Sequence, residues 1–277
     1  MDTANFSFLR LLAGSAVLAG VVALLGLSSL GKGHNPPPAR LATGAAQPVV
    51  VELFTSEGCS SCPPADALLK ELSEKPSLEG IEVVALEEHV DYWNHLGWAD
   101  PYSAGAFSQR QSEYAEHFGR DGVYTPQMIV DGRTEFVGSR GLIAREEIRK
   151  AASVRKLDIG LARVAESTPD HPAIQIAIQN PGSVPVKGGA ELWVAITERN
   201  LQSDVKGGEN SGEILKHAAV VRSLQKVRML PEPAGYTGQI DLFVRPNWKK
   251  DDLSAVVFLS EPGSRKIIGA ATTPLHP

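Results

Sequence analysis

The sequence predicts an α/β domain over residues 49–157, followed by a mostly antiparallel, β-sandwich-like domain over residues 158–277. Three observations lead to this α+β organisation. In the first part, strand-like and helix-like segments alternate and the order ends with a hairpin and a helix. In the second part, about seven short strand-like segments are separated by turn signals. A Cys-x-x-Cys motif, Cys59 to Cys62, stands between the first predicted strand and the first predicted helix.

The first predicted strand, Val49–Phe54, is a short run rich in β-branched residues. The helix after it begins at Pro63 and Pro64, because proline is tolerated in a first helical turn, where amide hydrogens have no partner. Its apolar residues recur at helical spacing: Ala65, Leu68, Leu69 and Leu72. Further helices are predicted over Pro101–Phe118 and Leu142–Val154, and further strands over Ile81–Leu86, Met128–Val130 and Thr134–Val137.

The second part is predicted to be all β. Ile174, Ile176 and Ile178 alternate with polar or small residues, as expected when one face of a strand is buried. Turn sequences such as Asn180-Pro181-Gly182 divide the strands. The predicted strands are Asp158–Val164, Ala173–Gln179, Glu191–Thr197, Ala218–Leu224, Gly238–Val244, Ala255–Leu259 and Ile267–Thr272.

Composition excludes some classes of protein. Hydrophobic residues make up 43% of the 277 residues and charged residues 21%, which is an ordinary globular balance. The formal net charge is −5 and no long basic run is present. A nucleic-acid partner is therefore not expected, because it would require a concentrated Lys/Arg surface.

The N-terminal segment indicates export. Residues 11–30 are apolar and uncharged, with Arg10 before them and Lys32 after them. This length suits either a membrane anchor or a long signal peptide, so residues 1–32 are assigned to one of the two. Residues 33–48 are rich in Pro and Ala and are predicted to be a linker. We therefore expect a periplasmic or extracellular protein, with membrane anchoring through residues 11–30 as one alternative.

The two cysteines are expected to do chemistry rather than stabilise the fold. A bridge between Cys59 and Cys62 closes a very short loop and so adds little stability. The positive end of a helix favours a thiolate, the form that attacks a disulfide. Cys59 is therefore predicted to be the accessible nucleophile and Cys62 the resolving thiol. No cofactor besides this redox-active disulfide is expected, and no metal site is assigned, because zinc usually needs a second cysteine pair. Inert thiols and metal binding remain the alternatives.

Long motifs in the chain resemble an exported thioredoxin-like family catalogued as domain of unknown function 1223. Residues 51–66 carry the first motif, Val-Glu-Leu-Phe-Thr-Ser-Glu-Gly-Cys-Ser-Ser-Cys-Pro-Pro-Ala-Asp. Other matching segments are residues 89–93 (His-Val-Asp-Tyr-Trp), Gly97-Trp98, Asp100-Pro101, residues 124–127 (Tyr-Thr-Pro-Gln), residues 208–210 (Gly-Glu-Asn), Leu215, His217 and residues 220–222 (Val-Val-Arg). The resemblance extends over roughly residues 48–275 and implies a thioredoxin-like fold for residues 49–157.

The resemblance also implies roles for single residues. In thioredoxin-like proteins a cis proline faces the dithiol, and Pro126 matches it by position. A cis Thr125–Pro126 bond would expose backbone for a substrate peptide to pair with. Thioredoxins bury an acid on the first strand behind the resolving cysteine, and Glu52 matches it. Such an acid could pass a proton to or from Cys62.

The segment after the second predicted strand contains several aromatic and histidine side chains. His89 and Trp93 are predicted to form a wall for the substrate, or His89 to tune Cys59. Aromatic packing around a satisfied polar cap is an equally good interpretation. His89 and His95 could also bind a metal together with the thiols.

The leading hypothesis is an exported thiol–disulfide oxidoreductase that acts on a protein or small-molecule thiol or disulfide. The catalytic residues would be Cys59, Cys62 and Glu52. The alternative is a non-catalytic binding or metal-delivery module on a thioredoxin-like fold. The sequence leaves the direction of electron flow open, because Ser60-Ser61 departs from the Gly-Pro pair of thioredoxin.

Overall fold

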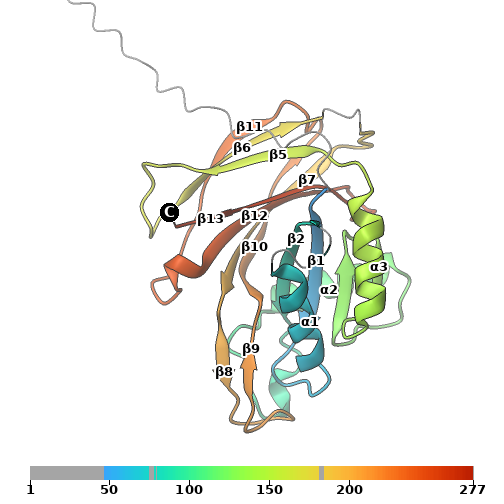
Figure 1. Ribbon diagram of the computed structural model, residues 1–277, viewed down its shortest axis with the longest axis vertical. Coiled ribbons are helices and arrows are strands. Elements are labelled where there is room, and N and C mark those ends of the chain that lie inside the picture. Colours follow the sequence, from blue (N-terminus) through green and yellow to red (C-terminus); the bar gives the residue numbers. More distant parts are fainter. Residues whose placement is uncertain (1–46, 75–77, 79, 181–183, 277) are drawn as a thin grey trace, which may run out of the picture. The chain divides into compact units, whose positions relative to one another are not determined.

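A computed structural model describes residues 47–74, 78, 80–180 and 184–276 and shows a mixed α/β fold with one large sheet (Figure 1). The apolar segment 11–30 and nearly all of the predicted linker lie outside the described residues. Within the part of the chain that the structure describes, no helix is long and apolar enough to cross a membrane.

The first half contains the alternating elements that the sequence predicts. In chain order they are β1 (Val49–Thr55), α1 (Pro63–Ser73), β2 (Val83–His89), the 3-10 turn η1 (Asn94–Leu96), α2 (Gly105–His117), β3 (Gln127–Val130), β4 (Thr134–Val137) and α3 (Gly141–Ala152). Helix α2 begins four residues later than predicted. The Asp100 side chain accepts a hydrogen bond from the Tyr102 amide and its carbonyl accepts one from Ser103, so a turn replaces the first helical turn.

The second half is all β, as predicted. Its elements are β5 (Asp158–Arg163), β6 (Ala173–Gln179), β7 (Ala190–Arg199), β8 (Gln202–Asp204), β9 (Ile214–Lys216), β10 (Ala219–Leu230), β11 (Thr237–Asp241), the 3-10 turn η2 (Lys250–Asp252), β12 (Leu253–Ser260) and β13 (Ile267–Pro274). The short β8–β9 hairpin was not predicted, because three-residue strands carry no alternation pattern.

Strands from both halves form one sheet. The eight strands lie in the order β13-β12-β7-β10-β2-β1-β3-β4. The join is a parallel contact between β10 and β2, in which Val220 is the partner of Glu87. The β-rich half is therefore continuous with the sheet of the first half rather than a sandwich set apart from it. The boundary near residue 157 stays a prediction, because a shared sheet does not show whether the two parts fold separately.

Helices and a second sheet cover the two faces of the large sheet. Helices α1 and α3 pack on one face of β1 and β3, through Leu53, Leu69 and Ile148 among others. Phe107 of α2 packs on the opposite face, with Val50 and Phe258. The three-stranded sheet β11-β6-β5 packs against β7, β12 and β13 through an aliphatic core. Strand β1 is thus buried along its whole length, with every residue shielded from water.

Candidate functional site

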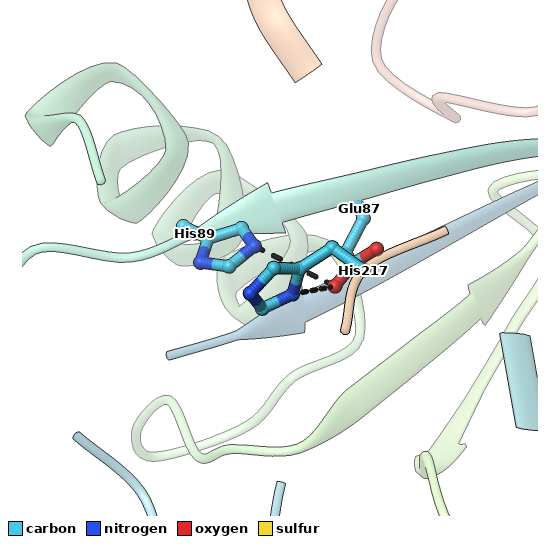
Figure 2. A group of neighbouring side chains, drawn as sticks. All are labelled: Glu87, His89 and His217. Atoms are coloured by element: carbon cyan, nitrogen blue, oxygen red, sulfur yellow. Dashed lines mark hydrogen bonds and ion pairs between the residues drawn. The ribbon is translucent and has the colours of Figure 1, made fainter. Parts of the chain in front are cut away.

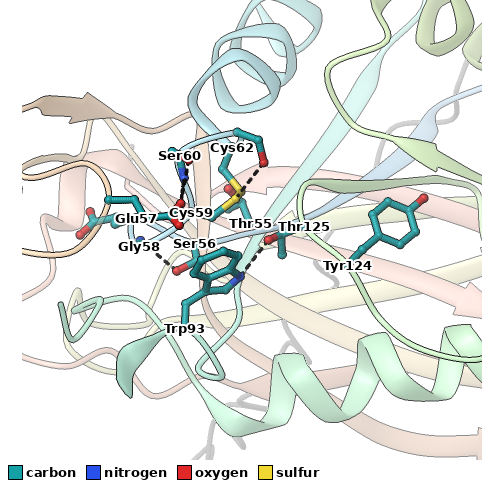
Figure 3. The surroundings of a disulfide bond; sticks show 12 residues. Thr55, Ser56, Glu57, Gly58, Cys59, Ser60, Cys62, Trp93, Tyr124 and Thr125 are labelled. Atoms are coloured by element: carbon teal, nitrogen blue, oxygen red, sulfur yellow. Dashed lines mark hydrogen bonds between the residues drawn. A yellow bond between two sulfur atoms is a disulfide. The ribbon is translucent and has the colours of Figure 1, made fainter. Parts of the chain in front are cut away.

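Cys59 and Cys62 lie in the loop between β1 and α1 and are joined by a disulfide bond (Figure 3). Their Cα atoms are 5.5 Å apart. Cys62 is the residue before the first turn of α1, and its carbonyl accepts hydrogen bonds from the amides of Ala65 and Asp66. The bond therefore lies at the N-terminal end of the helix, where the helix dipole favours negative charge.

The disulfide is shielded from solvent, whereas Cys59 was predicted to be accessible. Cys59 is 1% exposed and Cys62 0% exposed. The loop between β8 and β9 supplies part of the cover. Glu209 accepts hydrogen bonds from the amide (3.0 Å) and hydroxyl (2.7 Å) of Ser60. Asn210 donates to the carbonyl oxygens of Glu57 and Cys59. These contacts span about 150 positions of sequence, so no local pattern predicts them.

Two of the predicted substrate-binding residues meet beside the disulfide. The indole nitrogen of Trp93 donates to the hydroxyl of Thr125 over 2.9 Å, and both side chains lie near the sulfurs in Figure 3. The Thr125–Pro126 peptide bond is cis, as the resemblance implied. Trp93 also packs close to Gly58: a Cβ added to Gly58 would lie 3.3 Å from the Cβ of Trp93.

Glu52 does not lie on the face of β1 that α1 covers. Residues alternate along the strand, and Leu53 packs against α1 whereas Val50 packs on the α2 side. Glu52 accepts hydrogen bonds from Arg110 (2.5 Å) and Tyr114 (2.6 Å), both on α2. The expected position behind Cys62 is thus not the one observed, because the side-chain alternation directs Glu52 to the opposite face.

Asp66 is the buried acid on the α1 side of the strand. It is four residues after Cys62, so both lie on the same helix face. The hydroxyl of Thr55 donates to its carboxyl over 2.6 Å. Burial, assisted by the negative charge of Glu87, raises the pKa of Asp66 from 3.8 to about 7. Asp66 was not among the site residues predicted from the sequence; the Cys-Pro-Pro-Ala-Asp spacing is the signal that could have identified it.

His89 is fully buried, so it does not form a surface wall for a substrate. Its Nδ1 lies 2.7 Å from Asp100, and its Nε2 lies 3.5 Å from Glu87. Burial opposes the charged ring, but the Asp100 and Glu87 carboxylates outweigh burial and raise the pKa of His89 well above its ordinary value. His95, the second histidine considered for metal binding, is exposed on η1.

His217 joins His89 inside the protein. Its Nδ1 lies 2.8 Å from Glu87, and its Nε2 lies 3.0 Å from Glu57. Burial lowers the pKa of His217, but the hydrogen bonds with Glu57 and Glu87 prevail and raise it to about 9. Burial likewise raises the pKa of Glu87, while the contacts with His217 and His89 bring it down to about 2.

Glu57 connects this histidine cluster to the cysteine loop. One carboxylate oxygen of Glu57 contacts His217, and the other accepts a hydrogen bond from Trp98 over 2.8 Å. The Glu57 amide donates to Asp100. The Glu57 carboxylate is thus held by partners in the interior, two residues before Cys59. His217 lies 130 positions from Glu87 and 160 from Glu57, so the cluster exists only in the folded chain.

Comparisons with known proteins identify relatives of this chain. The family described as "Protein of unknown function (DUF1223)" matches residues 50–260. Protein AGR_C_4864 from Agrobacterium tumefaciens, which has a crystal structure, is 30% identical in sequence to this chain. The match covers 82% of this chain and 94% of that protein's chain, with a TM-score of 0.60. HBP35 of Porphyromonas gingivalis shares the fold with a TM-score of 0.62 at 18% identity, over 83% of this chain and 75% of that one. No curated protein matches the chain. Since the family match extends over most of the sequence, the chain belongs to the DUF1223 family.

Proposed function

We propose that this chain is an exported, thioredoxin-like thiol–disulfide oxidoreductase whose working group is the Cys59–Cys62 pair. One observation carries the proposal: the two cysteines are bonded at the N-terminal end of α1, with the buried carboxyl of Asp66 one turn further along the same helix face. The helix end favours a thiolate and the carboxyl can exchange a proton, and disulfide exchange requires both.

The exchange takes place in two steps. In the reducing direction, the Cys59 thiolate attacks one sulfur of a substrate disulfide, forms a mixed disulfide and releases the first substrate thiolate. Cys62 then attacks Cys59, which restores the internal bond and releases the second substrate thiolate. Two electrons and two protons pass from the dithiol to the substrate. In the oxidising direction the same steps run backwards, and a substrate dithiol becomes a disulfide.

Asp66 accepts the proton of Cys62 when that thiol attacks. Its pKa of about 7 makes it suitable for this role, because a group that titrates near the working pH can both take and return a proton. Glu52, the acid implied by the resemblance, is instead engaged by Arg110 and Tyr114 on the other face of β1. Glu52 therefore has a structural role in this proposal.

A substrate reaches the sulfurs beside Trp93 and Thr125. These side chains lie next to the bond, and their hydrogen bond to each other fixes the indole ring. Ser60 and Ser61 are exposed, so the surface around the motif is polar. Because Glu209 and Asn210 hold the loop closed over Cys59, an incoming thiol or disulfide must displace part of the β8–β9 loop. Export is supported by the apolar segment 11–30.

A mixed-disulfide trap tests the proposal. The Cys62→Ser variant keeps the attacking thiol but lacks the resolving one, so it should accumulate covalent adducts with a disulfide substrate such as insulin. Cys59→Ser is the matched control, and it should trap little because it lacks the attacking thiol and keeps only the resolving one. The wild type should reduce insulin with dithiothreitol as electron source.

The proposal fails if Cys62→Ser forms no more adduct than Cys59→Ser and the wild type does not accelerate insulin reduction. If the trap succeeds, measuring the equilibrium of the dithiol against glutathione decides which direction of exchange the pair favours.

A further inference from the structure

Glu87, His89 and His217 converge at the place where the two halves of the sheet join. Glu87 and His89 are two residues apart on β2, so their side chains leave the strand on the same side. His217 precedes β10, and the pairing of Val220 with Glu87 brings it alongside. One ligand atom from each of the three lies within 4.8 Å of the others, and all three residues are buried (Figure 2).

Each histidine is oriented by a carboxylate outside this triad. His89 Nδ1 contacts Asp100 and His217 Nε2 contacts Glu57. The opposite ring nitrogens, His89 Nε2 and His217 Nδ1, then face the same Glu87 oxygen at 3.5 and 2.8 Å. Histidine ligands in metal sites are held in this way, with one ring nitrogen directed to a carboxylate and the other left for the ion.

Among the residues that the structure describes, none is a hydrogen-bond partner of the buried ring nitrogen His89 Nε2. At 3.5 Å, its distance from Glu87 exceeds that of a good N–H···O bond. Buried polar atoms normally find a partner, so an unpaired nitrogen that points into a cluster of potential ligands indicates a missing one. This observation is independent of the convergence of the three side chains.

We propose that Glu87, His89 and His217 bind a divalent transition-metal ion, and that the ion holds β2 and the start of β10 together. Two imidazoles and one carboxylate form a donor set that zinc accepts, with a fourth position left for water. Because the site is buried, the ion is structural and does not meet a substrate. Through Glu57 it also supports the loop that carries Cys59. No metal site was assigned from the sequence, because a second cysteine pair is missing. His217 was not considered as a ligand there, since it is distant in sequence from Glu87 and His89.

Zinc titration of the full chain tests this proposal. The protein is first treated with a chelator and kept oxidised, so that the two sulfurs are bonded to each other and cannot bind metal. Calorimetry should show one zinc ion per chain, with protons released because zinc binds neutral imidazole. Zinc should also raise the melting temperature. The Cys59→Ser/Cys62→Ser variant should bind zinc equally well, which separates this test from that of the redox proposal.

Single substitutions locate the site. His89→Gln and His217→Gln should each weaken zinc binding by at least about 100-fold, and Asp100→Asn, which loses only an orienting carboxylate, by about 10- to 100-fold. His95→Gln is the matched control, because His95 is exposed, and it should bind like the wild type.

Two results would overturn the metal site: oxidised wild-type protein that binds no zinc, or binding that survives both His89→Gln and His217→Gln. Should these variants fail to fold, cobalt(II) added to the oxidised wild type decides the question. The visible spectrum of a four-coordinate nitrogen and oxygen site supports the proposal, and that of hydrated cobalt rejects it.

Discussion

Replacing Asp66 with Asn removes a buried carboxyl that can ionise and keeps its shape and its acceptor for the Thr55 hydroxyl. The pKa of Asp66 is about 7 in the folded protein, against 3.8 for an unperturbed carboxyl. The folded state therefore binds a proton more tightly than the unfolded state does. Between these two values, rising pH destabilises the fold, because only the unfolded chain ionises freely.

The size of the effect follows from the same two values. The difference between 7 and 3.8, at about 1.4 kcal/mol for each pKa unit, corresponds to about 4 kcal/mol once Asp66 is ionised. Asp66→Asn should thus increase the free energy of unfolding by about 4 kcal/mol at pH 8 and by about 2 kcal/mol at pH 5. The melting temperature at pH 8 should rise by about 10 °C.

Urea denaturation at pH 5 and pH 8 measures this gain, with a chelator present so that bound metal does not contribute. Insulin reduction by the same variant should become about 100-fold slower at pH 8, because the variant lacks the proton acceptor that we propose for Cys62. Asp121→Asn, at an exposed position, is the control and should change neither property. A variant that is less stable than the wild type at pH 8, or whose gain is equal at both pH values, would refute the reasoning.

Three further predictions concern the cover of the disulfide and two buried charges. Glu209→Gln weakens the contact with the cysteine loop and should make reduction of the disulfide by dithiothreitol a few-fold faster. Thiol titration over time measures this rate, and Glu213→Gln on the same loop is the control. Lys156→Met leaves Asp131 buried without its ion-pair partner and should cost about 3–5 kcal/mol in urea denaturation; adding Asp131→Asn should restore most of this. Glu52→Gln should lower stability by about 3 kcal/mol and leave the insulin-reduction rate of the folded protein unchanged, whereas a loss of rate comparable to that of Asp66→Asn would return the proton-transfer role to Glu52.

Much of the fold can be predicted from the sequence because it depends on local chemistry. Strand β1 is a run of apolar, β-branched residues, and α1 begins where Pro63 and Pro64 permit a helix to begin. The Cys59–Cys62 disulfide is equally local, since its two residues are three positions apart. The cis bond before Pro126 was expected from the family resemblance and not from local chemistry, and the structure contains it.

The face on which a side chain lies was harder to predict. Glu52 was matched to a thioredoxin acid by its strand position, but a loop one residue longer changes which face of β1 the matching residue occupies. A period of two means that one position decides between opposite faces. Asp66 was not selected from the sequence because its sequence context does not show how deeply α1 buries it.

The sequence by itself determined the order of the longer strands and helices and the pair of cysteines at a helix start, because these follow from propensities and contacts between near neighbours. Only the tertiary structure decided that β10 pairs with β2, that Glu209 closes over Ser60, and that His217 lies against Glu87. These contacts join residues more than 100 positions apart. Such pairings are selected by the burial of apolar surface over the whole fold, and no short sequence pattern records them.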